Sequence, residues 1–178
     1  FGDAGTGSGI TQILVGQRLF GGEGIDYLYG YSYSTRFSEG NPTNHVASEA
    51  TLQGDEFHGG EGGDWLYGGI RSDTFYGDSG NDTIQGDALV GPNYAENSRR
   101  ARSGGADIIY GGSGEDRLYG GGGSDIVWGG ADSDWLEGQN SVDTLYGGSG
   151  IDMLLLDSDP TYDPIPPSQF ETIDGQFG

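Results

Sequence analysis

Residues 111–130 read GGSGEDRLYGGGGSDIVWGG, in which GGSGEDRLY (111–119) is followed directly by GGGGSDIVW (120–128). Each nine-residue unit opens on glycines, carries an aspartate at its sixth position and places an apolar residue at its eighth. One such unit cannot bury its own apolar residue, so two adjacent copies predict a repeat whose units stack on one another.

Extending this frame along the chain finds eleven copies: one at 21–29, four at 50–85 and six at 102–155. The sixth-position aspartates are Asp26, Asp55, Asp64, Asp73, Asp82, Asp107, Asp116, Asp125, Asp134, Asp143 and Asp152. The eighth-position residues are Leu28, Phe57, Leu66, Phe75, Ile84, Ile109, Leu118, Val127, Leu136, Leu145 and Leu154. A flexible linker of turn-forming Gly and Asp has no need of an apolar residue two places after every aspartate, so the frame predicts an ordered structure.

The composition restricts the partners of the chain. Of 178 residues, 38 are glycine and 33% are hydrophobic, which argues against a thick aliphatic core. Seven basic and 28 acidic residues give a net charge of −21, which excludes nucleic acid as a partner and favours cations. Because the chain has no cysteine, metal binding must use oxygen. No apolar run approaches the ~20 residues that span a bilayer, there is no signal peptide and the first residue is Phe1, so we expect a piece of a longer protein.

The short period predicts an all-β solenoid. Glycine density excludes an α-helix, and a period of nine excludes collagen. Glycines at positions one, two and four suit a tight turn, while positions six to nine have room for a short strand with one inward residue. We expect two units to form one coil of two parallel three-residue strands and two turns, with coils stacked at ~4.8 Å.

The turns suit calcium, a hard cation that takes about six to eight oxygen ligands, carbonyls and carboxylates among them. Glycine turns let several carbonyls converge, and stacking brings aspartates of alternate copies together. Two carboxylates so close repel each other unless a cation lies between them. The expected pairs are Asp55 with Asp73, Asp64 with Asp82, Asp107 with Asp125, Asp116 with Asp134, Asp125 with Asp143, and Asp134 with Asp152.

These residues resemble the repeats-in-toxin (RTX) proteins, whose repeat is GGxGxDxUx, where U is an apolar residue. The resemblance covers about 21–29 and 50–155 and implies a right-handed parallel β-roll solenoid with calcium ions between glycine-rich turns. It also implies that carbonyls of positions one and three of one turn, and two and four of the next, complete each shell. The candidate ligands are then the eleven aspartates with Gly59, Gly60, Gly62, Gly111, Gly112, Ser113, Gly114, Gly120, Gly121, Gly122, Gly123, Gly129, Gly130, Ala131, Asp132, Gly147, Gly148 and Gly150.

Other sites fit the sequence less well. No stretch shows the spaced acidic loop of an EF-hand closed by a glutamate. The only two histidines, His45 and His58, lack the spacing of a transition-metal site. No helix follows the glycines, which argues against phosphate binding.

The frame also divides the chain. Residues 1–20 have glutamine and serine where aspartate belongs, so we expect metal-free coils or a cap. Residues 21–155 form the expected roll, with 31–49 and 87–101 as enlarged turns. The proline-containing segment 156–178 is expected to be a cap or linker, with Tyr162, Phe170 or Phe177 as lids.

Two functions fit these features. The first is a non-enzymatic calcium-binding module that folds on binding calcium, as a structural part of a larger secreted or cell-surface protein. The second is the accessory repeat domain of a secreted protease, lipase or polysaccharide-modifying enzyme, or a segment of a carbohydrate-binding adhesin. The chain offers neither a nucleophile with a histidine base nor a zinc site, so we expect no catalysis in this chain itself. The resemblance implies a bacterial protein exported by type I secretion.

The ninth positions predict a column of rings. If each insert replaces one turn and adds no strand, His58, Tyr76, Tyr110, Trp128 and Tyr146 lie on the outer face of one sheet. Such a column either stabilises neighbouring strands or binds a partner, for which a glycan or another segment of the parent protein are the candidates.

Overall fold

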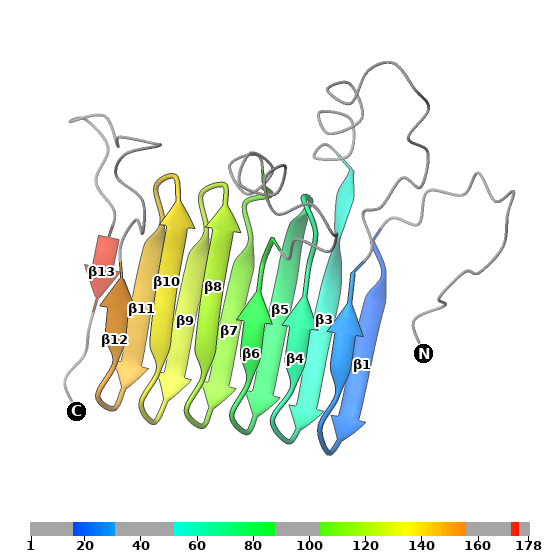
Figure 1. Ribbon diagram of the computed structural model, residues 1–178, viewed down its shortest axis with the longest axis horizontal. Coiled ribbons are helices and arrows are strands. Elements are labelled where there is room, and N and C mark those ends of the chain that lie inside the picture. Colours follow the sequence, from blue (N-terminus) through cyan, green and yellow to red (C-terminus); the bar gives the residue numbers. More distant parts are fainter. Residues whose placement is uncertain (1–15, 31–51, 88–103, 156–171, 175–178) are drawn as a thin grey trace, which may run out of the picture.

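The computed structural model describes residues 16–30, 52–87, 104–155 and 172–174, and these form two parallel β-sheets (Figure 1). Sheet A contains β1 (Arg18–Glu23), β3 (Gln53–Glu61), β5 (Ser72–Ser79), β7 (Ile108–Ser113), β9 (Ile126–Ala131), β11 (Thr144–Ser149) and β13 (Thr172–Asp174), in that order. Sheet B contains β2 (Tyr27–Tyr29), β4 (Trp65–Tyr67), β6 (Thr83–Gln85), β8 (Arg117–Gly122), β10 (Trp135–Asn140) and β12 (Met153–Leu155).

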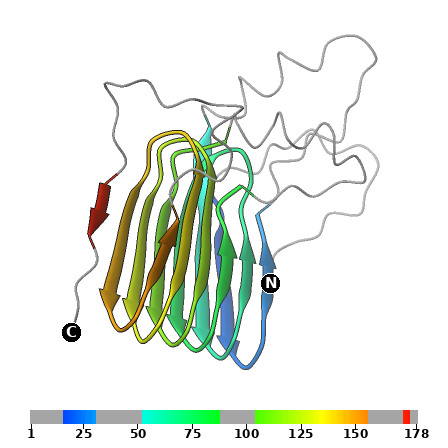
Figure 2. The same cartoon turned by 60° about the vertical axis from the view of Figure 1, so that its left-hand side comes forward.

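Successive strands alternate between the two sheets, so two nine-residue units make one coil of a parallel β-roll. The two sheets face each other along the whole stack (Figure 2). Strands on the same sheet pair in register at equivalent positions, as Ile109 does with Val127 and Val127 with Leu145. β1 pairs directly with β3, and β5 with β7, across the two inserts. Each insert therefore replaces one turn without displacing the register, as the sequence predicts.

The core is a single column of eighth-position side chains between the sheets. Phe57, Leu66, Phe75, Ile84, Ile109, Leu118, Val127, Leu136 and Leu145 are fully buried. The phenylalanine rings of β3 and β5 stack with their centroids 4.6 Å apart. Leu28 and Leu154 lie in end coils and are only partly buried. The alternation along each strand thus buries one residue in every nine and turns its two neighbours outward.

The turns form two edges. The lower edge in Figure 1 joins sheet A to sheet B through 21–26, 59–64, 77–82, 111–116, 129–134 and 147–152. The upper edge joins sheet B back to sheet A through the complete turns 68–73, 120–125 and 138–143. Both inserts interrupt the upper edge, after β2 and after β6.

The roll extends beyond the repeat frame at both ends. β1 begins at Arg18, and Leu19 is 6% exposed in the core, so residues 16–20 continue the first coil. At the other end β13 pairs with β11, which the sequence did not predict. Several strands run six to nine residues because pairing continues into the glycine turns, where three were expected. The predicted lids Tyr162, Phe170 and Phe177 lie outside the described residues.

Candidate metal centre

The sixth-position aspartates form two columns, one along each edge. The lower column contains Asp26, Asp64, Asp82, Asp116, Asp134 and Asp152. The upper column contains Asp55, Asp73, Asp107, Asp125 and Asp143, with Gln17 in the equivalent place of the first coil. All six pairs expected from the sequence are neighbours, and the columns also join Asp26 to Asp64, Asp73 to Asp107 and Asp82 to Asp116 across the inserts.

Within each column, one oxygen of every carboxylate except that of Asp26 accepts a hydrogen bond from the backbone of the preceding coil. The backbone N–H of Asp64 donates to Oδ1 of Asp82 at 2.7 Å, and that of Asp125 donates to Oδ1 of Asp143 at 2.9 Å. The second oxygen, Oδ2, has no hydrogen-bond partner in most of these aspartates. Buried Oδ2 atoms without a hydrogen-bond partner occur in Asp26, Asp64, Asp82, Asp107, Asp116, Asp125 and Asp134. A buried charged oxygen without a partner is strongly unfavourable, so the columns have an unmet requirement for cations.

Electrostatics lead to the same conclusion. Burial, with a smaller contribution from neighbouring carboxylates, raises the pKa of Asp82 and Asp116 to about 7 and that of Asp125 to about 8. Backbone hydrogen bonds to the same groups oppose the shift but do not cancel it. Without a cation these carboxyls would hold protons near neutral pH, and a bound cation would displace the protons.

The backbone of the turns supplies further oxygens. In turn 59–64, Gly60 and Gly62 have φ of 109° and 129°, a conformation that L side chains rarely adopt. Carbonyls at positions two and four point toward the following coil, since a Cβ on Gly80 would overlap Gly62 O. Carbonyls at position three point toward the preceding coil, where Ser79 O accepts from Gly62 N–H at 2.8 Å. Consecutive turns therefore direct carbonyls into the gap that they share.

These oxygens can converge only because position one is glycine. A Cβ on Gly59 would lie 2.6 Å from Oδ2 of Asp64 and 2.6 Å from the carbonyl oxygen of Gly77 in the next turn. The same two kinds of oxygen converge beside Gly111, Gly120 and Gly129. Among the described residues, no three His, Cys, Asp or Glu side chains gather at one point, so any ion here depends on carbonyls. Carboxylates combined with carbonyls fit calcium, which accepts irregular shells of hard oxygen ligands.

The remaining predicted turn residues lie where the frame expects them, at equivalent positions of stacked turns. Ser113 pairs with Ala131, Gly112 with Gly130, Gly130 with Gly148, and Gly121 with Gln139. Gly114, Gly123, Asp132 and Gly150 all have positive φ at position four, and Gly122 is buried in the upper edge. Gly147 lies beside Oδ2 of Asp152 in the last lower-edge turn.

One carboxylate near the upper column was missed. The sequence assigns Asp87 to the second insert, but its buried carboxylate accepts hydrogen bonds from Gly122 N–H at 2.8 Å and Gly105 N–H at 3.3 Å. Burial raises its pKa to about 8. Gly86 and Asp87 directly follow Gln85 and so hold positions one and two of a copy that the insert interrupts. This continuation of the frame is the sequence signal that could have placed Asp87 in the upper edge.

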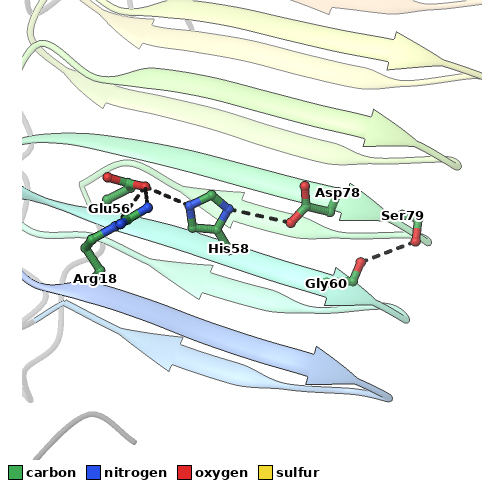
Figure 3. Close-up of polar contacts among 6 residues, drawn as sticks. All are labelled: Arg18, Glu56, His58, Gly60, Asp78 and Ser79. Atoms are coloured by element: carbon green, nitrogen blue, oxygen red, sulfur yellow. Dashed lines mark hydrogen bonds and ion pairs between the residues drawn. The ribbon is translucent and has the colours of Figure 1, made fainter.

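The predicted ring column is present on the outer face of sheet A. Phe20, His58, Tyr76, Tyr110, Trp128 and Tyr146 stack in succession, with centroids 4.6–5.3 Å apart and interplanar angles of 7–11°. His58 Nε2 also lies 2.8 Å from Glu56 Oε1, which pairs with Arg18, and Nδ1 lies 3.8 Å from Asp78 (Figure 3). His58 thus belongs to the ladder, and the structure does not describe His45.

Comparison with protein families agrees with this geometry. A family model described as the RTX calcium-binding nonapeptide repeat matches four times, at residues 17–32, 58–88, 103–136 and 119–154. These matches cover more than half of the 178 residues. No curated protein and no solved structure matches the chain. In the part of the chain that the structure describes, no helix is long and apolar enough to cross a membrane. The fold, the two aspartate columns and the repeat together place this chain in the RTX calcium-binding nonapeptide repeat family, as a calcium-binding parallel β-roll.

Proposed function

We propose that the chain is a structural module that folds when calcium enters the gaps between successive turns, with the frame aspartates and turn carbonyls as ligands. The observation that carries this proposal is the row of buried, unpartnered Oδ2 atoms beside converging carbonyls. Each ion would be held by carboxylates of two neighbouring coils. Binding would therefore fasten coil to coil along both edges.

Folding and binding are coupled because the metal-free chain has little else to stabilise it. The core contributes one apolar side chain per nine residues, and the net charge of −21 opposes compaction. Metal binding then supplies folding free energy, as in other small metal-dependent domains. Affinities of extracellular calcium sites, roughly 10⁻⁴ to 10⁻³ M, would leave the chain unfolded inside the cell and folded after export.

The test is circular dichroism with EDTA, with about 10⁻³ M calcium, and with the same concentration of magnesium. We expect a β spectrum with calcium alone, since magnesium requires a small octahedral shell and retains its waters. The same folded spectrum in EDTA and in calcium would refute coupled folding. Absence of bound calcium in equilibrium dialysis would refute the site.

We further propose that the chain serves a larger secreted or surface protein as a non-catalytic part. The roll contains the described residues 16–30, 52–87 and 104–155 together with β13, and the segments on either side of it would link it to its neighbours or cap it. The frame aspartates are calcium ligands in this proposal, and carboxylates bound to calcium cannot act as the general acid and base of a glycosidase. The parent protein is expressed in a strain with a type I secretion system, with and without calcium in the medium, and its amount in the medium and at the cell surface tests whether it is exported.

The ring ladder favours a structural role over glycan binding. A sugar docks against the flat face of an aromatic ring, but here the faces are covered by the neighbouring rings. Solvent meets the ring edges. We propose that the ladder stabilises sheet A, each pair contributing about 0.2–1 kcal/mol.

A further inference from the structure

One buried cation lies among the carboxylates of the upper column. Arg71, at position four of turn 68–73, is 2% exposed, although arginine is almost never fully buried unless it is paired with a negative group. Asp55 and Asp73 are both in its electrostatic range. Burial raises the pKa of each carboxyl, and the charge of the Arg71 guanidinium opposes that rise. Arg71 thus supplies positive charge at the place where the other coils have only oxygen atoms.

The backbone of this turn departs from the others. In every other complete turn of the described residues, positions two and four both have positive φ. Gly69 and Arg71 hold these positions in turn 68–73, and neither has positive φ. Loss of glycine is not the reason. Turn 138–143 has Gln139 and Ser141 at the same positions, and these still have φ of 74° and 86°.

The hydrogen bonds to the carboxylate of Asp73 also differ from those in the other turns of the upper column. Its Oδ1 accepts from the N–H of Asp55 at 2.6 Å, as in the other coils. Its Oδ2 accepts from the N–H of Gly69 at 2.9 Å, whereas the equivalent Oδ2 atoms of Asp107 and Asp125 are buried without a hydrogen-bond partner. Both oxygens of Asp73 therefore accept hydrogen bonds from backbone N–H groups.

We propose that the buried charge of Arg71 takes the place of a calcium ion, so that turn 68–73, which carries Asp73, binds no metal. The inference rests on the proposed calcium-binding function and replaces, for the two gaps that border turn 68–73, the expectation that an ion is shared. It also gives the roll a segment, β3 with β5, in which a cation of the protein reduces the repulsion between carboxylates before calcium arrives. The stacked rings of Phe57 and Phe75 lie in the same segment. Folding on calcium would then begin here and extend along the array.

The first test compares two aspartates of the same column. Calcium bound per chain is measured by equilibrium dialysis at saturation for Asp73→Asn and Asp125→Asn. Both residues are buried, and burial raises the pKa of both. We expect Asp73→Asn to bind as many ions as the unmodified chain and Asp125→Asn to bind fewer. Loss of an ion in Asp73→Asn would overturn the inference while leaving the proposed function intact. An unmodified chain that binds no calcium would instead refute the function.

The second test restores the repeat. Arg71→Gly changes GGIRSD to GGIGSD, and we expect the folded variant to bind one calcium ion more than the unmodified chain. Arg71→Lys keeps a cation and should leave the number unchanged. Arg117→Gln removes an exposed arginine of β8 and controls for the change in net charge. A folded Arg71→Gly chain with no additional ion would overturn the inference; if that variant does not fold, the comparison of aspartates decides.

Discussion

The backbone N–H of Asp107 donates a hydrogen bond of 2.9 Å to Oδ1 of Asp125, eighteen residues further along the chain. The N–H of Asp125 donates in turn to Oδ1 of Asp143 at 2.9 Å. Every interior aspartate of a column is therefore bound to a coil on each side. Loss of one such residue disturbs two gaps, whereas loss of a terminal one disturbs a single gap.

Asp125→Ala should accordingly raise the calcium concentration at the folding midpoint more than Asp152→Ala does. Asp152 accepts from the N–H of Asp134 at 3.0 Å in the last lower-edge turn and is less buried than Asp125. The midpoints are read from circular dichroism during calcium titration. Equal midpoints would argue against ions shared between coils.

Calcium binding should depend on pH near neutrality. In the metal-free roll, burial raises the pKa of Asp82 and Asp116 to about 7 and of Asp125 to about 8, from an ordinary 3.8. The folded metal-free chain therefore holds protons that the unfolded chain has released, and its stability falls as pH rises from about 4 to about 8. Calcium needs the deprotonated groups, so its affinity should rise over the same range.

Two measurements check this dependence. Circular dichroism in EDTA should show more β structure at about pH 4.5 than at pH 7.5. Calorimetric titration with calcium, in two buffers of different ionisation enthalpy, should detect proton release near pH 7. A metal-free spectrum that is independent of pH, together with calcium binding without proton release, would contradict the prediction.

Gly62→Ala should destabilise the calcium-loaded roll more than Gly24→Ala. Both glycines are at position four of lower-edge turns, with φ of 129° and 103°, so each alanine incurs the left-handed penalty of about 1–2 kcal/mol. A Cβ on Gly62 would also overlap the carbonyl of Gly24, while one on Gly24 would meet open space. Urea unfolding in saturating calcium measures both variants. Similar losses would mean that the close approach of the coils is unimportant.

Trp128→Ala should destabilise the roll more than Trp135→Ala. Trp128 stacks between Tyr110 and Tyr146, with centroids 4.6 and 5.3 Å away, so its removal breaks two ring pairs worth about 0.2–1 kcal/mol each. Trp135, on sheet B, is 36% exposed and pairs with the non-aromatic residues Arg117 and Met153. The calcium midpoints of the two variants provide the comparison. An unchanged midpoint with loss of glycan binding in Trp128→Ala would favour a docking surface.

The sequence predicts the regular part of the molecule because the nine-residue spacing specifies the turns, the buried positions and the exposed positions together. Asp at position six and an apolar residue at eight fix the turn, the inward side chain and the outward ninth position. The assignment of His58 and Trp128 to one sheet follows from that spacing, and so do the neighbouring aspartate pairs. The ladder confirms both the frame and the treatment of the inserts.

The repeat frame misses residues that lie at equivalent places of the stacked coils but differ from the consensus residue type. Gln17 donates its N–H to Oδ1 of Asp55 at 2.8 Å and so needs no carboxylate to join the upper column. Asp87 is a side chain at a position that normally holds glycine, and its role is visible only once the coils are stacked. The burial of Arg71 is likewise visible only in the folded roll, where its charge acts on Asp55, sixteen residues earlier in the sequence.

The two edges of the roll differ in continuity. All lower-edge turns of the described residues are uninterrupted six-residue segments, whereas the described chain breaks off three times, after β2, β6 and β12, and each of these strands ends at the upper edge. One edge thus acts as a spine, and the other accepts extra sequence without disturbing the stack. A peptide grafted into turn 120–125 should be displayed on a roll that still assembles, whereas the same graft in turn 111–116 should divide the spine into two separately folding halves.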